Sequence, residues 1–171
     1  MIESSGIIVS IVAGLILFFS FIGGYTQGAV KSFFSLISLI IAIPVAGIFY
    51  PFFAGLLSFL PGRDWENFIG FFITLAIASI ILAFVFFLPR KLTENTWPNG
   101  LILRLIGGFL NLLGAGIGLV MFKYLFSAFP VWDWLREAIV NSSVINWLVS
   151  TLGFVLELLP EVIRNSIGPG V

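Results

Sequence analysis

The sequence contains no cysteine and no histidine among its 171 residues. Without cysteine it has no disulfide, no thiolate nucleophile and no thiolate ligand for zinc or an iron–sulfur cluster. Without histidine it lacks the commonest general base and the commonest metal ligand. We therefore expect no metal, no other cofactor and no enzyme activity, because catalysis would have to depend on serine, lysine or carboxylates alone.

Charge is also scarce. Charged residues make up 9% of the chain and hydrophobic residues 60%, with a mean hydropathy of +1.17. Soluble domains have roughly 25% charged residues, so this composition excludes a water-soluble monomer. Eight basic residues balance eight acidic ones, which gives no basic surface for nucleic acid. The composition indicates an all-α integral membrane protein whose first partner is the lipid bilayer.

Four long runs without charge predict four transmembrane helices, since crossing roughly 30 Å of hydrocarbon takes about 20 apolar residues. The predicted spans cover residues 7–24, 33–53, 68–88 and 105–123. Pro44 lies inside the second span and is expected to kink it. Pro51, Pro61 and Gly62 are expected to break the chain after that span. We expect these spans to form one bundle over residues 1–129.

The distribution of basic residues predicts the orientation of the spans. The connections 24–32 and 89–104 carry Lys31, Arg90, Lys91 and Arg104, whereas the opposite side carries Arg63, Lys123 and Arg136. Because cytoplasmic loops are enriched in lysine and arginine, this four-to-three excess places both connections inside and both termini outside. In a bacterium the membrane would be the plasma membrane.

Lys123 stands at the end of the fourth apolar run. It follows Arg104 by 19 residues, or roughly 28 Å of helix. We expect the two cations to extend to opposite membrane interfaces. The alternative is that Lys123 is a buried, functional ammonium.

Small residues recur on one face of the fourth span. Gly107, Asn111, Gly114 and Gly118 have offsets of 0, 4, 7 and 11, which match one side of a helix. Membrane helices approach closely where small residues meet, so this face is predicted to pack against another helix. We also assign Gly24 and Gly28, after the first span, to helix packing. Self-association through such a surface is the alternative.

Residues 130–171 are predicted to form an amphipathic tail on the outer face. Six polar or small residues have the spacing of one helical stripe: Asn146, Ser150, Gly153, Glu157, Glu161 and Arg164. We predict a helix over 144–159 that lies in the membrane interface and stops at Pro160. A fifth span is the alternative. Trp132, Trp134, Trp147 and Glu157 are the residues that we expect to contact the interface or a partner.

Two stretches resemble the colicin V production protein family. In residues 24–61, the matching positions are Gly24, Tyr25, Gly28, Tyr50 and Pro51. In residues 99–118, they are Gly100, Arg104, Leu105 and Gly107. Family members commonly carry an Asp early in the first span and another before the arginine of the fourth. Residues 8–11 and 102–103 have no acid here, so any role of those carboxylates does not carry over.

The resemblance implies an inner-membrane protein linked to bacteriocin production, biofilm formation and envelope stress, without an established catalytic reaction. We therefore expect an accessory or scaffold protein that acts through other membrane or envelope proteins, or as a homo-oligomer. The alternative is a channel or transport subunit, in which Asn111, Lys123 and Thr74 would line a polar path. The first three spans contain no acid, which argues against a proton- or cation-coupled transporter.

Overall fold

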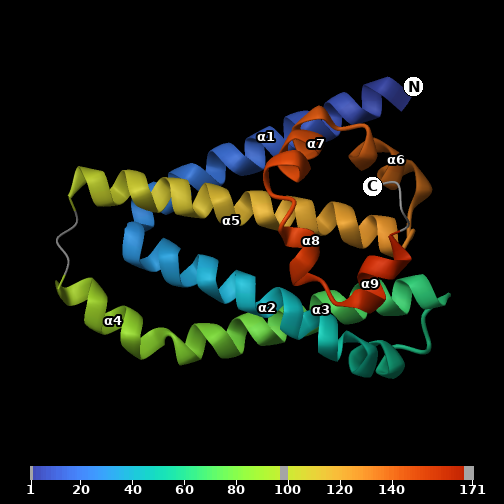
Figure 1. The fold of residues 1–171 in the computed structure, drawn as a ribbon, viewed down its shortest axis with the longest axis horizontal. Helices are drawn as coiled ribbons and strands as arrows, with labels where there is room; N and C mark the ends of the chain where they lie inside the picture. The colour runs from blue at the N-terminus through green and yellow to red at the C-terminus, as the bar shows by residue number, and fades with distance from the viewer. Residues whose placement is uncertain (1, 97–99, 168–171) are drawn as a thin grey trace.

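The computed structural model describes residues 2–96 and 100–167, and this part of the chain is helical without strands. The helices follow one another as α1 (Ile2–Gln27), α2 (Ala29–Leu56), α3 (Arg63–Val85), α4 (Phe87–Thr96), α5 (Leu101–Ala128), α6 (Asp133–Val140), α7 (Ser143–Thr151), α8 (Val155–Leu158) and α9 (Glu161–Ser166) (Figure 1). The all-α fold class is confirmed.

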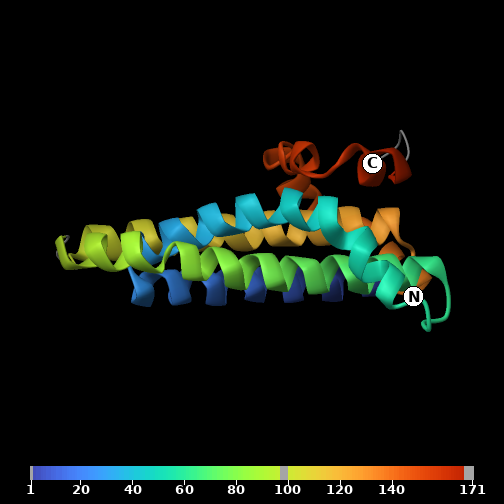
Figure 2. The same cartoon turned by 90° about the horizontal axis from the view of Figure 1, so that it is seen from below.

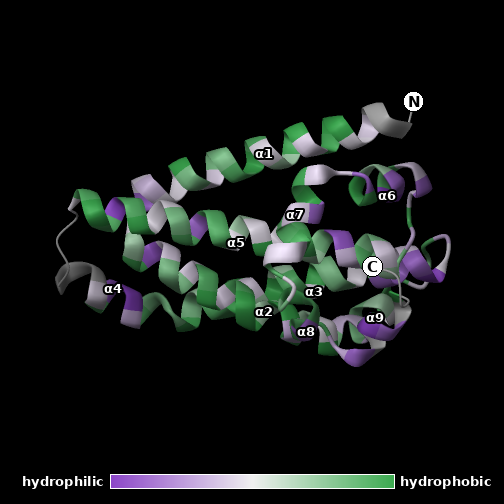
Figure 3. Ribbon diagram, turned by 45° about the horizontal axis from the view of Figure 1, so that its top comes forward, coloured by the Kyte–Doolittle hydropathy of each residue, from purple (hydrophilic) through white to green (hydrophobic). Residues whose placement is uncertain are grey.

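Four of these helices are long and apolar enough to cross a membrane, which confirms the predicted number of spans. They are α1, α2, α3 and α5, with 23 to 28 residues each in the apolar segment. Figure 3 shows hydrophobic residues along these four helices and hydrophilic ones gathered on α4 and α6. Large apolar side chains remain exposed on them, among them Ile80 at 69% and Phe84 at 82%, as lipid-facing positions require.

The long helices form a row instead of a closed bundle. Their order across the row is α1, α5, α2 and α3, and each packs mainly against its immediate neighbours. Seen from the side, the row is thin, and the last helices of the tail, α8 and α9, lie over one face of it (Figure 2). At one end α3 also reaches α5, where the ring of Phe68 lies 4.9 Å from that of Phe126.

The predicted connection 24–32 is much shorter in the structure. Only Gly28 separates α1 from α2, and its φ of 84° is a conformation that favours glycine. Its N–H donates to the carbonyl of Gly24 at 2.9 Å, and its own carbonyl accepts from Ser32 at 3.2 Å. The positive φ of Gly28 thus lets the chain reverse within one residue, and the helical hydrogen bonds on both sides of it are kept.

The structure differs from the prediction at Pro51 and near Pro89. The expected break at Pro51 is wrong, because α2 runs through both Pro44 and Pro51 to Leu56. The predicted third span to residue 88 ends earlier, since α3 stops at Val85 and α4 starts at Phe87. Pro89 accounts for this early end. It has no N–H to donate to the carbonyl of Val85, four residues before it, and in a continuous helix its ring would clash with that carbonyl.

The single helix predicted over 144–159 is wrong. Helix α7 ends at Thr151, and a turn around Gly153 precedes α8. The break allows the chain to cross from α5 to α2 while five side chains stay buried beneath it: Leu148, Leu152, Val155, Leu159 and Ile163. A straight helix could not follow this path. No part of the described tail is long enough for a fifth span.

The main core lies where α2, α5 and the tail meet. Ile43 on α2, Ile117 on α5 and Val155 on α8 are all fully buried in it. Tail residues thus supply part of the core of this protein, so the tail and the long helices form one packed unit.

Candidate functional site

The closest helix contact joins the turn at Gly28 to α5. A β-carbon at Gly107 would lie 2.5 Å from the carbonyl carbon of Gly28 and 2.6 Å from the carbonyl oxygen of Gly24. Such distances to backbone atoms leave no room for any side chain. Nearby, the side-chain amide of Asn111 donates to the carbonyl of Ser20 on α1 at 2.8 Å. These contacts bring together Gly24, Gly28, Gly107 and Asn111 at the α1–α5 crossing.

The face expected to pack does not continue along the whole of α5. A β-carbon at Gly114 would make an ordinary contact, 3.6 Å from Leu36, and one at Gly118 would meet nothing within 4 Å. Two other glycines of α5 do lie beneath neighbours. A β-carbon at Gly108 would lie 2.8 Å from the ring of Phe21, and one at Gly116 would lie 3.0 Å from the side chain of Leu152 in the tail. Helix α5 has partners on several sides, so no single stripe contains all its close contacts.

A cavity of about 320 Å³ opens beside the Gly28 turn, between α2, the α3–α4 junction and α5; we call it the α2–α5 cavity. Its polar lining consists of Gln27, Lys31, Ser35, Ser38, Ser79, Arg90 and Asn111. Lys31 and Arg90 are its cations, and none of the described lining residues is acidic. Phe34 and Phe86, with ring centroids 5.6 Å apart, form part of its apolar wall. In the sequence, Lys31 and Arg90 belong to two separate predicted connections, 24–32 and 89–104.

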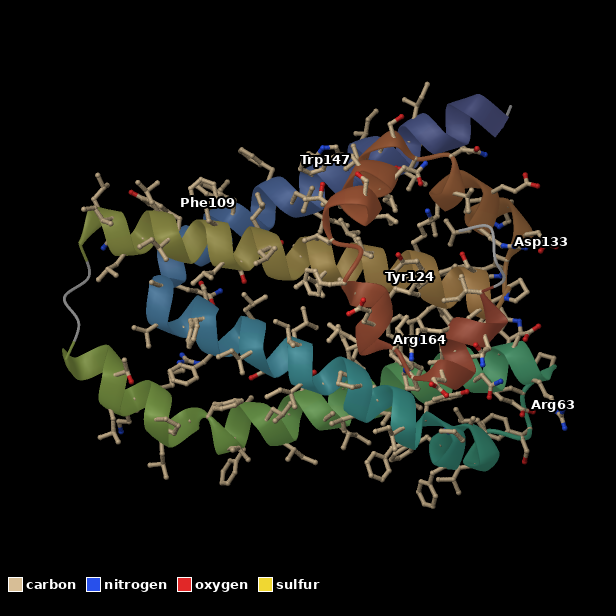
Figure 4. All side chains as sticks on the ribbon, viewed as in Figure 1. Arg63, Phe109, Tyr124, Asp133, Trp147 and Arg164 are labelled. Carbon is tan, nitrogen blue, oxygen red and sulfur yellow. The ribbon has the colours of Figure 1, made fainter. Side chains whose placement is uncertain are left out.

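A second polar region lies at the other end of α5. Lys123 is only 6% exposed, and its Nζ donates to Oδ1 of Asn146 on α7 at 3.0 Å. The amide of Asn146 in turn donates to the carbonyl of Val140 at 2.7 Å. The expectation that Lys123 extends to the membrane interface is wrong, because the tail folds over it and supplies a hydrogen-bond acceptor there. Tyr124, the next residue of α5, is also buried, and Figure 4 places it on α5 beside the tail.

A second hydrogen bond ties the tail to α1. The hydroxyls of Ser10 and Ser142 are 2.9 Å apart, and Ser142 is fully buried. Ser142 is also the N-cap of α7, where its oxygen accepts from the N–H of Ile145 at 3.4 Å. One serine therefore both starts α7 and joins it to the first long helix.

The aromatic residues expected at an interface lie on the short helices and the turn before them. Trp134 is 66% exposed and Trp147 63%, and Figure 4 places Trp147 on α7 near α1. Trp132 is 47% exposed and packs edge-on against Trp65, with 5.1 Å between ring centroids. Glu157 on α8 is exposed.

The three residues of the alternative polar path lie at three separate contacts. Asn111 bonds to α1, Lys123 bonds to α7, and the hydroxyl of Thr74 donates to Gly70 of its own helix at 2.7 Å. They do not line one continuous route. Among the described residues there is also no group of three or more acidic side chains placed to hold a metal ion.

Four long apolar helices, with close glycine crossings and a tail docked on one side, define a multi-pass helical membrane protein. Residues 9–153 match the family described as colicin V production protein, so the chain belongs to this family, as its resemblance predicted. It is similar to a colicin V production protein homolog of Haemophilus influenzae, with 27% identity over 159 residues and 91% of each chain covered. No solved structure matches the chain.

Proposed function

We propose that the protein is a non-enzymatic scaffold of the bacterial plasma membrane that supports an envelope or bacteriocin-export process by binding partner proteins. The observation that carries this proposal is the docked tail. It is held against α5 and α1 by Lys123–Asn146 and Ser10–Ser142, yet it leaves large aromatic side chains uncovered. A surface that is already ordered suits recognition, because binding a partner then costs little conformational entropy.

The exposed aromatics support a protein partner in addition to lipid. Tryptophan is enriched both at membrane interfaces and among the residues that dominate binding energies. Trp134 lies on α6 together with the charged residues Asp133, Arg136 and Glu137, and Trp147 lies on α7, so neither belongs to the apolar surface of the long helices. Both termini outside would place this surface in the periplasm.

Site-specific photo-crosslinking in native membranes tests the proposal. A photoreactive residue at Trp134 or Trp147 should yield a discrete protein adduct, identified by mass spectrometry and reproduced from the partner's side. The same residue at Phe84, an exposed apolar position on α3, serves as the matched control and should yield lipid adducts. Lipid adducts alone at all three positions would contradict a scaffold role, and adducts with a second copy of the chain would identify a homo-oligomer.

A further inference from the structure

We infer that the α2–α5 cavity binds the phosphate-bearing headgroup of an anionic phospholipid, with an acyl chain in the apolar groove beside it. The inference concerns the other end of the molecule from the docked tail and does not depend on the scaffold role. It rests on the charge of the cavity, its position along the helices and the chemistry of the neighbouring groove.

Charge selects an anion. Lys31 and Arg90 come from different helices and line the same cavity, which has no described acidic lining residue. Guanidinium and ammonium groups bind phosphate through charge-assisted hydrogen bonds. The hydroxyls of Ser35 and Ser79 line the same space and could donate to the ester oxygens of a headgroup. The hydroxyl of Ser38 donates to the carbonyl of Phe34 at 2.7 Å and could accept from a glycerol hydroxyl.

The position of the cations matches the depth of lipid phosphates. Lys31 lies in the first turn of α2, and Arg90 follows the end of α3 at Val85 by five residues. Both therefore stand at the ends of apolar segments, where the hydrocarbon region gives way to headgroups. From Lys31 the cavity extends along α2 to Leu39, which is eight residues or about 12 Å farther.

The neighbouring groove favours a lipid over a soluble anion. This apolar groove has a volume of about 430 Å³ and is lined mainly by aliphatic and aromatic residues, including Val30, Phe33, Leu103 and Ile106. It shares Phe34 and Leu110 with the α2–α5 cavity, so the two spaces adjoin. A charged space next to an apolar one is complementary to an amphiphile. Basic pockets between membrane helices bind anionic headgroups in this way.

The test measures lipid binding to the delipidated full-length protein in detergent by native mass spectrometry. Dioleoylphosphatidylglycerol should bind about tenfold or more tightly than zwitterionic dioleoylphosphatidylcholine. The double variant Lys31→Gln/Arg90→Gln should lose this preference. The matched control Lys91→Gln/Arg104→Gln removes two exposed cations at the same end of the molecule and should retain it.

Two further measurements distinguish lipid binding in the cavity from binding elsewhere and from binding of a soluble phosphate. Ser79→Leu fills the cavity without changing charge and should also weaken phosphatidylglycerol binding, at an unchanged melting temperature. Glycerol 3-phosphate should fail to compete with the lipid. Equal binding of the two lipids by the unmodified protein, or equal losses in the cavity and control variants, would overturn the inference. Effective competition by glycerol 3-phosphate would also overturn it, in favour of a soluble phosphate ligand.

Discussion

The ammonium of Lys123 lies 3.0 Å from the side-chain oxygen of Asn146, and this bond joins the apolar helix α5 to the tail helix α7. Lys123 is buried although Asn146 is exposed, so the asparagine covers the charge from outside. A buried ammonium without a hydrogen-bond acceptor is unfavourable, because it loses its hydrogen bonds to water and gains none to the protein. The tail thus compensates a charge that the long helices alone would leave uncovered.

Asn146→Leu should therefore destabilise the protein by about 1.5–3 kcal/mol, the range for a hydrogen bond to a charged group. The double variant Lys123→Met/Asn146→Leu should recover part of this loss, since it removes the charge together with its acceptor. Thermal unfolding in detergent measures both. Ser150→Ala, at an exposed position of the same helix, is the control. Equal stability of Asn146→Leu and Ser150→Ala would show that the bond contributes nothing.

Gly107→Ala should destabilise the helix crossing by about 1–3 kcal/mol or prevent assembly. The added carbon would meet backbone atoms of Gly24 and Gly28, which cannot turn aside as a side chain can. Gly118→Ala, on the same helix with open space around it, should be neutral or slightly stabilising. Thermal unfolding of the two variants in detergent measures the difference, and similar stabilities would show that the Gly107 contact does not hold the helices together.

The number of spans could be predicted from the sequence because length and hydropathy are local properties. The row order of the helices could not, because it depends on which faces meet. Gly107 and Gly108 illustrate the difference. The spacing of small residues indicated Gly107, whereas the contact of Gly108 with Phe21 requires knowing that α1 lies beside α5.

From the sequence, a buried Lys123 was only the alternative and the cavity was not predicted, for a related physical reason. The separation of Lys123 from Arg104 indicates a position at one membrane boundary. Its hydrogen-bond acceptor, Asn146, lies 23 residues farther along the chain, in the tail that covers it. Lys31 and Arg90 are likewise brought to one cavity only by the packing of α2 against the α3–α4 junction. The tail was expected as a helix because its polar spacing fits one, but the burial of Leu152 and Val155 against the long helices favours the break.

Gly47→Ala should loosen the end of the tail, because a β-carbon on Gly47 would overlap the ring of Pro160. Gly55→Ala on the same helix faces open space and is the matched control. A cysteine introduced at Ile163, a fully buried position, reports the change through its rate of reaction with a thiol reagent. We expect faster labelling with Gly47→Ala than with Gly55→Ala. Identical rates would mean that this contact does not hold the tail.

The orientation of the helices in the membrane follows from which positions share an end of the molecule. The beginning of α1, the α2–α3 connection and α6 lie at one end, and the Gly28 turn and α4 lie at the other (Figure 1). The connections at the second end carry Lys31, Arg90, Lys91 and Arg104, whereas the α2–α3 connection at the first end is followed by Arg63 alone, so we expect the second end to face the cytoplasm.

Single cysteines test this orientation cleanly, because the chain has none of its own. Ser58→Cys, Ser143→Cys and Thr26→Cys are conservative changes at exposed positions. A membrane-impermeant thiol reagent on intact cells should label the first two, which lie at the end predicted outside. Thr26→Cys should react only after the membrane is opened, because one residue, Gln27, separates it from the Gly28 turn. Labelling of Thr26→Cys alone in intact cells would reverse the orientation and place the docked tail, with Trp134 and Trp147, in the cytoplasm.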